Sequence, residues 1–375
     1  MRILTLILAI FNFGIFTSNA AVASEGRKGP PFRNITHPIV DDRGPPGARA
    51  LHPLRSVTVD LMKKIGPVKD QADRGTCSIF ASTALLESML ILSGALPPHS
   101  SLSEEWLEYL ITRRTHFEGS DAHDNLMMLT RFGSVPDRMM PYIGETWSRR
   151  DYSPLSTDRC AKAAGPVLRD CLLGHRDPRL LNEPDGALLD AKGPFFDPEL
   201  ERARASAVVF QKRFLAQAET EFKIRSTSEV KFLLSHGIPV IVELDFFDGA
   251  WNHSDGPAHG IHRSMDQWYR GIVGYPEVGS VDRTQGLRAK DGHSVLIVGY
   301  DDDLEVSTSS VMNDGSVQKF SYKGVYYFKN SWGTESFGSH FELEGERFPG
   351  YGMMTQAYAH EFGGFYKLKV APNLW

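Results

Sequence analysis

Apolar residues follow a helical period just after the first cysteine of the chain. The apolar residues Ile79, Leu86 and Leu90, with Thr83 between them, recur at steps of four, three and four positions, which places them on one face of a helix. Thr76 is a suitable N-cap and Gly94 a suitable end. The pattern therefore predicts a helix with Cys77 in its first turn.

The period changes along the chain. The segment SEEWLEYLITRR after Ser103 predicts a helix with an acidic first turn and a basic last turn, and further helices are expected over 125–132 and after Asp197-Pro198. Later runs are typical of strands, namely 240–246, HSVLIVGYDDD and GVYYFKNSWG. A mainly helical first half and a strand-rich second half predict an α+β fold with two lobes.

The first residues have the features of a signal peptide, predicted over 1–23. Arg2 precedes an apolar stretch over 3–16, and Ala21-Val22-Ala23 offers a small-residue cleavage pattern near Ala23. The apolar stretch is too short for a membrane span, which needs about 20 residues. We therefore expect a secreted or periplasmic protein with no membrane span in the mature chain.

The local composition separates the rest of the chain into a leader and a folded domain. Residues 24–53 are crowded with Pro, Gly and charge, which predicts an exposed leader that cannot form a helical inhibitory domain and need not be removed for activity. The folded domain is predicted over 54–375, with a turn-rich insertion containing one helix at about 144–225.

The bulk composition limits the kinds of binding partner that we expect. The 375 residues are 41% hydrophobic and 23% charged, with a net charge of −5, which is ordinary for a globular protein. No basic block carries interleaved aromatic residues, so neither nucleic acid nor an anionic membrane surface is expected as a partner.

The three cysteines suggest one disulfide and one free thiol. Cys160 and Cys171 are close in sequence, and an exported protein permits them to pair. The alternative is that both stay reduced and buried. Pairing would leave Cys77 free as a candidate nucleophile.

Four residues fit nucleophilic thiol chemistry. A thiolate at the start of a helix is stabilised by the helix dipole, so Cys77 is the candidate nucleophile. His293 begins an apolar strand and is the candidate base, and Asn330 would orient its second ring nitrogen. Gln71, six positions before Cys77, would hold an oxyanion together with the Cys77 N–H. Trp332 is expected to shield the histidine–asparagine contact from water.

These motifs, in this order, resemble those of the papain-like cysteine peptidases. The residues around Cys77 are similar to those of a bacterial-type branch of that family. The similar stretches are VKDQADRGTCSIFA, SLSEEWLEYL, FGSVPDRMMPY, HSVLIVGYD and KNSWGTESFG. The resemblance implies a two-lobed fold with the site in the cleft between the lobes. It also implies hydrolysis of peptide or protein substrates through an acyl-enzyme, with no metal or organic cofactor.

The sequence departs from the family pattern at several positions. Arg74 stands where many members have a disulfide cysteine, Ser78 where many have tryptophan, and Phe337-Gly338 where Trp-Gly is usual. The distance from Cys77 to His293 is longer than in the family by roughly the length of the insertion.

Two other functions remain open at this point. The same triad could serve an acyl transferase or an amidase acting on cell-wall peptide, or the chain could be a catalytically silent binding protein. A metal site at His253, His259 and His262 is not expected, because no carboxylate or cysteine has ligand spacing there, and a solvated loop is predicted instead.

Overall fold

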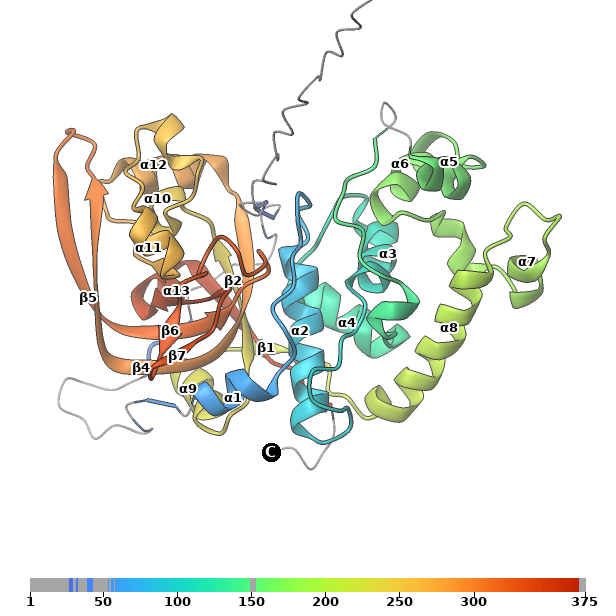
Figure 1. The fold of residues 1–375 in the computed structure, drawn as a ribbon, viewed down its shortest axis with the longest axis horizontal. Coiled ribbons are helices and arrows are strands. Elements are labelled where there is room, and N and C mark those ends of the chain that lie inside the picture. Colours follow the sequence, from blue (N-terminus) through green and yellow to red (C-terminus); the bar gives the residue numbers. More distant parts are fainter. Residues whose placement is uncertain are drawn as a thin grey trace, which may run out of the picture.

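The computed structural model describes residues 27–29, 32, 39–42, 53, 55–56, 58–148 and 153–370. The predicted signal peptide lies outside these ranges, as does most of the predicted leader. The described chain forms a helical lobe beside a lobe built on a β-sheet (Figure 1). This is the predicted α+β, two-lobed architecture.

The helical lobe contains α2 to α8. Their bounds are α2 Cys77–Leu92, α3 Glu104–Thr115, α4 Ala122–Phe132, α5 Pro154–Cys160, α6 Gly165–Gly174, α7 Asp185–Leu189 and α8 Pro198–Phe210. Short helical turns join them at Asp137–Met139, Pro178–Asn182 and Gln211–Leu215. The predicted caps are confirmed for two of these helices: Ser103 accepts a hydrogen bond from the Trp106 N–H at the start of α3, and Asp197 caps α8.

Helix α2 lies at the boundary between the lobes (Figure 1). It begins at Cys77 and ends just before Gly94, as predicted, but it is buried on all sides rather than on one face. The reason is that the helical lobe covers one side and the sheet covers the other. The Thr76 hydroxyl does not cap the helix; it hydrogen-bonds to the Tyr142 hydroxyl at 2.7 Å.

The insertion is more helical than its sequence predicts. It contains the four helices α5 to α8, where a single helix was expected, because proline stands in the first turn of α5, α6 and α8 and starts short helices. Cys160 and Cys171 form the predicted disulfide, with their Cα atoms 5.9 Å apart, and Cys77 is the free cysteine. The disulfide and Trp147 lie in a small hydrophobic cluster of their own.

The second lobe is built on a seven-stranded sheet with the order β1-β9-β2-β4-β5-β8-β3. The strands are β1 Lys223–Ile224, β2 Val240–Asp245, β3 Ile272–Val273, β4 Gly292–Val311, β5 Val317–Lys329, β8 Tyr351–Thr355 and β9 Gly363–Tyr366. All pairs are antiparallel except β3 with β8. Strands β6 Glu342–Leu343 and β7 Glu346–Arg347 form a separate hairpin.

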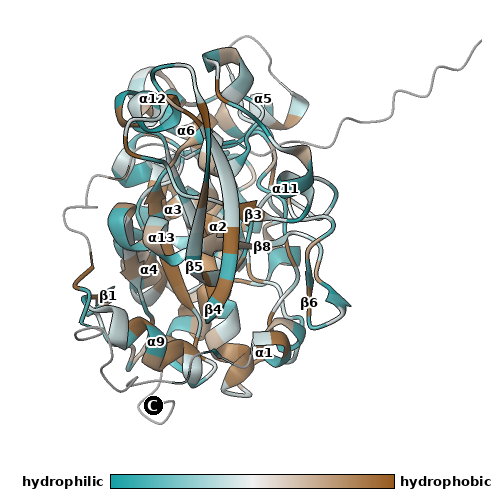
Figure 2. Ribbon diagram, turned by 90° about the vertical axis from the view of Figure 1, so that its left-hand side faces the viewer, coloured by the Kyte–Doolittle hydropathy of each residue, from teal (hydrophilic) through white to brown (hydrophobic). Residues whose placement is uncertain are grey.

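Strands β4 and β5 change character along their length. The start of β4 and the end of β5 are buried and apolar, whereas the hairpin between them is polar and largely exposed (Figure 2). The buried ends of these strands are adjacent to α2. His293 is the second residue of β4, and Asn330 directly follows β5.

In the part of the chain that the structure describes, six further helices accompany the sheet. They are α1 Thr58–Lys64, α9 Thr227–Ser235, α10 Asp248–Trp251, α11 Met265–Tyr269, α12 Val281–Ala289 and α13 Gln356–Phe362, with a 3-10 turn at Gly256–His259. Within the described ranges, no helix has the length and apolar character needed to cross a membrane.

Candidate active site

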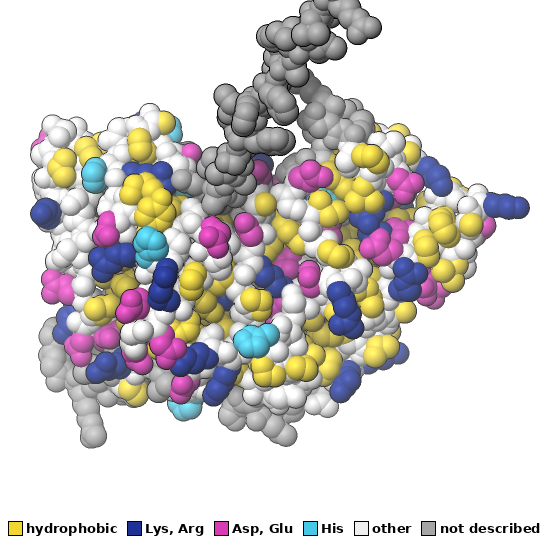
Figure 3. Space-filling view, in the orientation of Figure 1, with side chains coloured by type: hydrophobic (Ala, Val, Ile, Leu, Met, Phe, Trp, Pro, Cys, Tyr) yellow, Lys and Arg dark blue, Asp and Glu magenta, His cyan; other side chains and the backbone are white. Residues whose placement is uncertain are grey.

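A cleft lies between the two lobes. One wall comes from the helical lobe, including Asp73, Gly75 and Glu118, and the other comes from the sheet lobe, including Asp255 and Asp291. The leader residues 27–29 lie in this cleft. On the face shown in Figure 3, Asp and Glu side chains flank the boundary between the lobes.

Cys77 occupies the start of α2, where the helix dipole favours a negative charge. Its N–H is in the first turn, so the helix supplies no carbonyl partner for it. The sulfur lies against the backbone amides of Ser294, Ser78 and Gly29. Because Ser294 directly follows His293, the thiol of α2 and the start of β4 meet at this point.

His293 and Asn330 are brought together by strand pairing. Strands β4 and β5 are antiparallel, which places the start of one beside the end of the other. The His293 Nε2 lies 2.9 Å from the Asn330 Oδ1, and both side chains are buried. Among the described residues, the His293 Nδ1 has no hydrogen-bond partner. The asparagine therefore fixes the ring through one nitrogen and leaves the other available.

Trp332 covers this pair. Its ring stacks on that of His293 with centroids 4.5 Å apart and an interplanar angle of 28°, and its side chain is buried. Phe246 and Trp251 contact the imidazole edge to face. The aromatic shell excludes water from the His293–Asn330 hydrogen bond, which is the shielding that the sequence suggested for Trp332.

Gln71 is buried beside residue 27, and both ends of its side-chain amide form hydrogen bonds. Its Oε1 accepts a hydrogen bond of 2.6 Å from the Ser331 hydroxyl. Its Nε2 donates to the Arg74 carbonyl at 2.8 Å and to the Arg27 carbonyl at 2.7 Å. The side-chain amide of Gln71 is thus bonded to a peptide carbonyl of the leader, which is the type of group that an oxyanion hole binds.

The leader passes directly over the sulfur. Gly29 pairs with Gly292 as an isolated antiparallel bridge, with N–H to O distances of 2.8 and 3.1 Å. A Cβ atom added at Gly29 would lie 2.6 Å from the Cys77 Sγ. The sequence did not anticipate this contact, because a Pro/Gly-rich stretch carries no periodic signal of its own.

Burial determines the protonation states of Cys77 and His293. It raises the pKa of the Cys77 thiol to about 12, against the opposing effect of the neighbouring backbone N–H groups. It lowers the pKa of His293 to about 3, although the hydrogen bond with Asn330 acts in the opposite direction. With the leader in place, thiol and imidazole are therefore both neutral at pH 7.

A buried carboxyl group lies behind the cysteine. Glu243 of β2 accepts a hydrogen bond of 2.5 Å from the Ala122 N–H at the start of α4 and one of 3.4 Å from the Ser294 hydroxyl. Burial raises the pKa of Glu243 well above its usual range, and the nearby Asp121 raises it further. Burial therefore favours the protonated form of Glu243. Its place inside an apolar strand carries no sequence signal for such a group.

Arg74 has a structural role at the position where many papain-like peptidases have a disulfide cysteine. Its guanidinium group is fully buried and forms an ion pair of 3.1 Å with Glu118. It also donates to the carbonyls of Ile143 at 3.1 Å and Leu173 at 2.6 Å. Since Leu173 belongs to α6, Arg74 ties the segment before Cys77 to the insertion.

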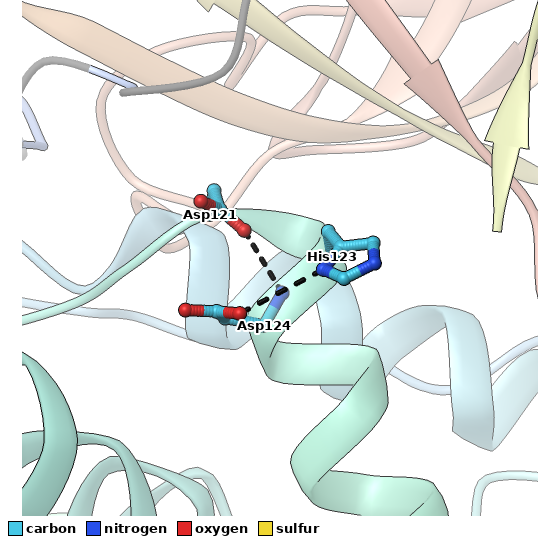
Figure 4. A group of neighbouring side chains, drawn as sticks. All are labelled: Asp121, His123 and Asp124. Carbon is cyan, nitrogen blue, oxygen red and sulfur yellow. Dashed lines mark hydrogen bonds and ion pairs between the residues drawn. The ribbon is translucent and has the colours of Figure 1, made fainter. Parts of the chain in front are cut away.

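Two groups of side chains offer metal-ligand atoms within the described ranges. One is at the start of α4, where Asp121, His123 and Asp124 lie together (Figure 4). Here the Asp121 carboxylate accepts from the Asp124 N–H at 2.8 Å, and Asp124 pairs with Arg114 at 3.3 Å. Helix capping and an ion pair account for this group.

The other group corrects the expectation for the histidine-rich loop. His259 and His262 are exposed, as predicted, but His253 is buried. Two carboxylates that are not regularly spaced with it in sequence, Asp248 and Asp255, lie near its ring. The loop folds back on itself, so that sequence spacing does not show which side chains meet.

No family model and no curated protein sequence matches this chain. Several solved structures are similar to it. Xylellain, a cysteine protease from Xylella fastidiosa, is 15% identical over 91% of this chain and 97% of that one, with a TM-score of 0.46. Digestive procathepsin L 3 of Tenebrio molitor is 16% identical over 92% and 76%, with a TM-score of 0.45.

The cysteine protease and lectin-like domains of Cwp84 from Clostridium difficile are 16% identical over 92% of this chain, with a TM-score of 0.47. This chain spans 57% of that one. Because identities and TM-scores are low throughout, we derive the function from the side chains of this chain.

Proposed function

We propose that the chain is a papain-like cysteine peptidase that hydrolyses peptide bonds through Cys77, His293 and Asn330. The observation that carries the proposal is the peptide backbone in the cleft. The Gln71 amide binds the Arg27 carbonyl at 2.7 Å while Gly29 lies on the sulfur. A site that holds a peptide carbonyl beside a free thiol and an oriented imidazole has the parts that acyl transfer from a peptide requires.

The reaction begins when a substrate replaces residues 27–29 and water enters. Hydration lowers the pKa of Cys77 and raises that of His293, so a proton moves from sulfur to the His293 Nδ1. The thiolate attacks the peptide carbonyl carbon. The oxygen becomes an anion held by the Gln71 Nε2 and the Cys77 N–H.

Collapse of this intermediate breaks the C–N bond. His293 gives its proton to the leaving amine, and the acyl group stays on the sulfur as a thioester. A water molecule then attacks the thioester while His293 takes its proton. The carboxylic acid leaves and the thiol is restored, so that the overall reaction consumes one water for each peptide bond. Asn330 keeps the ring in position throughout.

We place this enzyme outside the cytosol. The disulfide between Cys160 and Cys171 supports an oxidising compartment, because such bonds are rare in the cytosol. This agrees with the predicted signal peptide over 1–23, so a secreted or periplasmic location is part of the proposal.

The test is hydrolysis of a mixed peptide library by the exported protein. Cys77→Ala should reduce cleavage to background, because no other free thiol is available in the described chain. Asn330→Ala should reduce kcat about ten- to a hundredfold, since the imidazole still adopts its working orientation part of the time. Asn313→Ala, in the exposed β4–β5 turn, is the matched control and should leave cleavage unchanged.

Two results would overturn the proposal. Cleavage that persists in Cys77→Ala would remove the nucleophile. Iodoacetamide that labels Cys77 without any peptide being cleaved would point to one of the other functions, an acyl transferase or amidase acting on cell-wall peptide, or a silent binding protein.

A further inference from the structure

Three carboxylates gather on the sheet side of the cleft. Asp248 is the first residue of α10, Asp255 precedes the turn at Gly256–His259, and Asp291 lies two residues before His293. They come from two separate loops of the sheet lobe. We call Asp248, Asp255 and Asp291 the acidic subsite.

A lysine of the leader occupies the acidic subsite. The Lys28 Nζ lies 2.7 Å from Asp248, 3.0 Å from Asp255 and 3.6 Å from Asp291. The Lys28 side chain is only 14% exposed. Its ammonium group also lies 5.3 Å from the centroid of the Phe246 ring, which is close enough for a cation–π interaction. The site thus contains a bound cation that belongs to a separate segment of the chain.

The backbone that carries this lysine is bound in the cleft like a peptide ligand. The Arg27 carbonyl accepts a hydrogen bond from Gln71, and Gly29 forms a single antiparallel β-bridge with Gly292 at the start of β4. Main-chain bonding of this kind accepts many sequences, and selectivity comes from the pockets that receive side chains. The residue next to the one over the sulfur thus directs its side chain to the acidic subsite.

Departure of the leader leaves an unbalanced charge. Three carboxylates then lie close together near one imidazole, His253, whose Nδ1 is 3.4 Å from Asp248 and 3.6 Å from Asp255. Like charges at this distance repel, and an incoming cation relieves the repulsion. Asp248 is largely buried, so its attraction for a cation is screened less than that of a surface carboxylate.

We propose that the acidic subsite selects peptide substrates with a lysine or arginine side chain beside the scissile bond. This inference rests on the proposed function and specifies its substrate class. Lys28 serves as the internal model of that side chain. Phe246 links the subsite to the chemistry, because its ring packs against His293 with centroids 6.0 Å apart.

The first experiment measures a ratio of rates. Full-length protein is given paired peptides that differ only in Lys, Ala or Glu at one position at a time next to the cleaved bond. The ratio of kcat/KM values is the appropriate readout. A leader that blocks a fraction of the enzyme molecules lowers the rate for all peptides by the same factor, so the ratio does not change. We expect one position at which Lys is preferred over Ala at least about tenfold and over Glu by more, with the preference falling as salt is added.

Variants then assign the preference to the acidic subsite. The double variant Asp248→Asn with Asp255→Asn should bring the Lys to Ala ratio below about threefold. Asp266→Asn, an exposed carboxylate on α11, is the control and should keep the wild-type ratio. A ratio that is unchanged in the double variant, with cleavage still dependent on Cys77, would overturn the inference and leave the proposed function intact.

A binding measurement covers the case in which no peptide is cleaved. Calorimetry with the Cys77→Ala, Lys28→Ala chain compares the peptide GRKGPP with GREGPP at low salt. At least about tenfold tighter binding of the lysine peptide supports the acidic subsite even if the proposed hydrolysis fails. Equal affinity of the two peptides would overturn the inference.

Discussion

The side chains around Cys77 combine the proposed catalytic residues with a buried acid. Cys77, His293 and Asn330 come from α2, β4 and the end of β5, and each is placed by the element that carries it. Glu243 has no equivalent role in the proposed chemistry. It is fully buried next to the thiol, and its negative charge would oppose formation of the thiolate. Protonation of Glu243 avoids this conflict.

The variant Glu243→Gln tests whether Glu243 is protonated in the folded protein. The folded-state pKa of Glu243 is above its unfolded value, so its contribution to stability is complete at low pH and is lost as the pH rises toward the folded pKa. Glutamine keeps the hydrogen-bond acceptor and removes the titration. Between the unfolded pKa of about 4.3 and the folded pKa, the free energy of unfolding of the wild type should therefore fall relative to that of the variant by about 1.4 kcal/mol per pH unit.

Urea unfolding at pH 5, 6 and 7 measures the difference between variant and wild type. Glu335→Gln, at an exposed position, serves as the control and should follow the wild type at each pH. Parallel stability curves for Glu243→Gln and wild type would mean that Glu243 is already ionised at pH 5.

At the scale of elements, the leader behaves differently from what its composition suggests. The sequence predicts a leader that cannot form a helical inhibitory domain and need not be removed for activity. The structure places residues 27–29 across Cys77, with contacts to Gln71, Gly292 and the acidic subsite. Three residues are enough to cover a sulfur atom, so no helical domain is required. These contacts favour a leader that shields the thiol.

Gly29→Ala should open this contact. Its new Cβ would lie 2.6 Å from the Cys77 Sγ and 3.3 Å from the Gly292 carbonyl oxygen, so the segment must move. Iodoacetamide should then label Cys77 about tenfold faster, in proportion to the larger open fraction. Gly186→Ala, where the added Cβ meets nothing within 4 Å, is the control. Equal labelling rates in Gly29→Ala and wild type would show that the leader does not limit access.

On the scale of the whole molecule, the insertion is part of the structure that supports the site. Arg74 joins the segment before Cys77 to Glu105, Glu108 and Glu118 and to the carbonyl of Leu173 in α6. The insertion is therefore attached three residues before Cys77.

Arg74→Met should destabilise the whole protein by about 3–5 kcal/mol, because it leaves buried carboxylates without their cation. Arg138→Met, at an exposed position, should change stability by less than about 0.5 kcal/mol. Urea unfolding measures both. A loss below about 1 kcal/mol for Arg74→Met would mean that the insertion is held by other contacts.

The sequence alone determined the features that depend on neighbours along the chain. Helix α3 follows Ser103 and α8 follows Asp197, because a capping side chain acts within one turn of the helix that it starts. The two-lobed fold class followed from the change of period, and the pairing of Cys160 with Cys171 followed from their proximity and the count of cysteines.

Only the tertiary structure decided which distant groups meet. Three features join residues that are far apart in the chain. They are the burial of Glu243 and His253, the attachment of the insertion through Arg74, and the binding of Lys28 among three carboxylates. Such contacts are set by the packing of the two lobes and by the loss of water around charged groups. Neither leaves a periodic or compositional signal in the sequence.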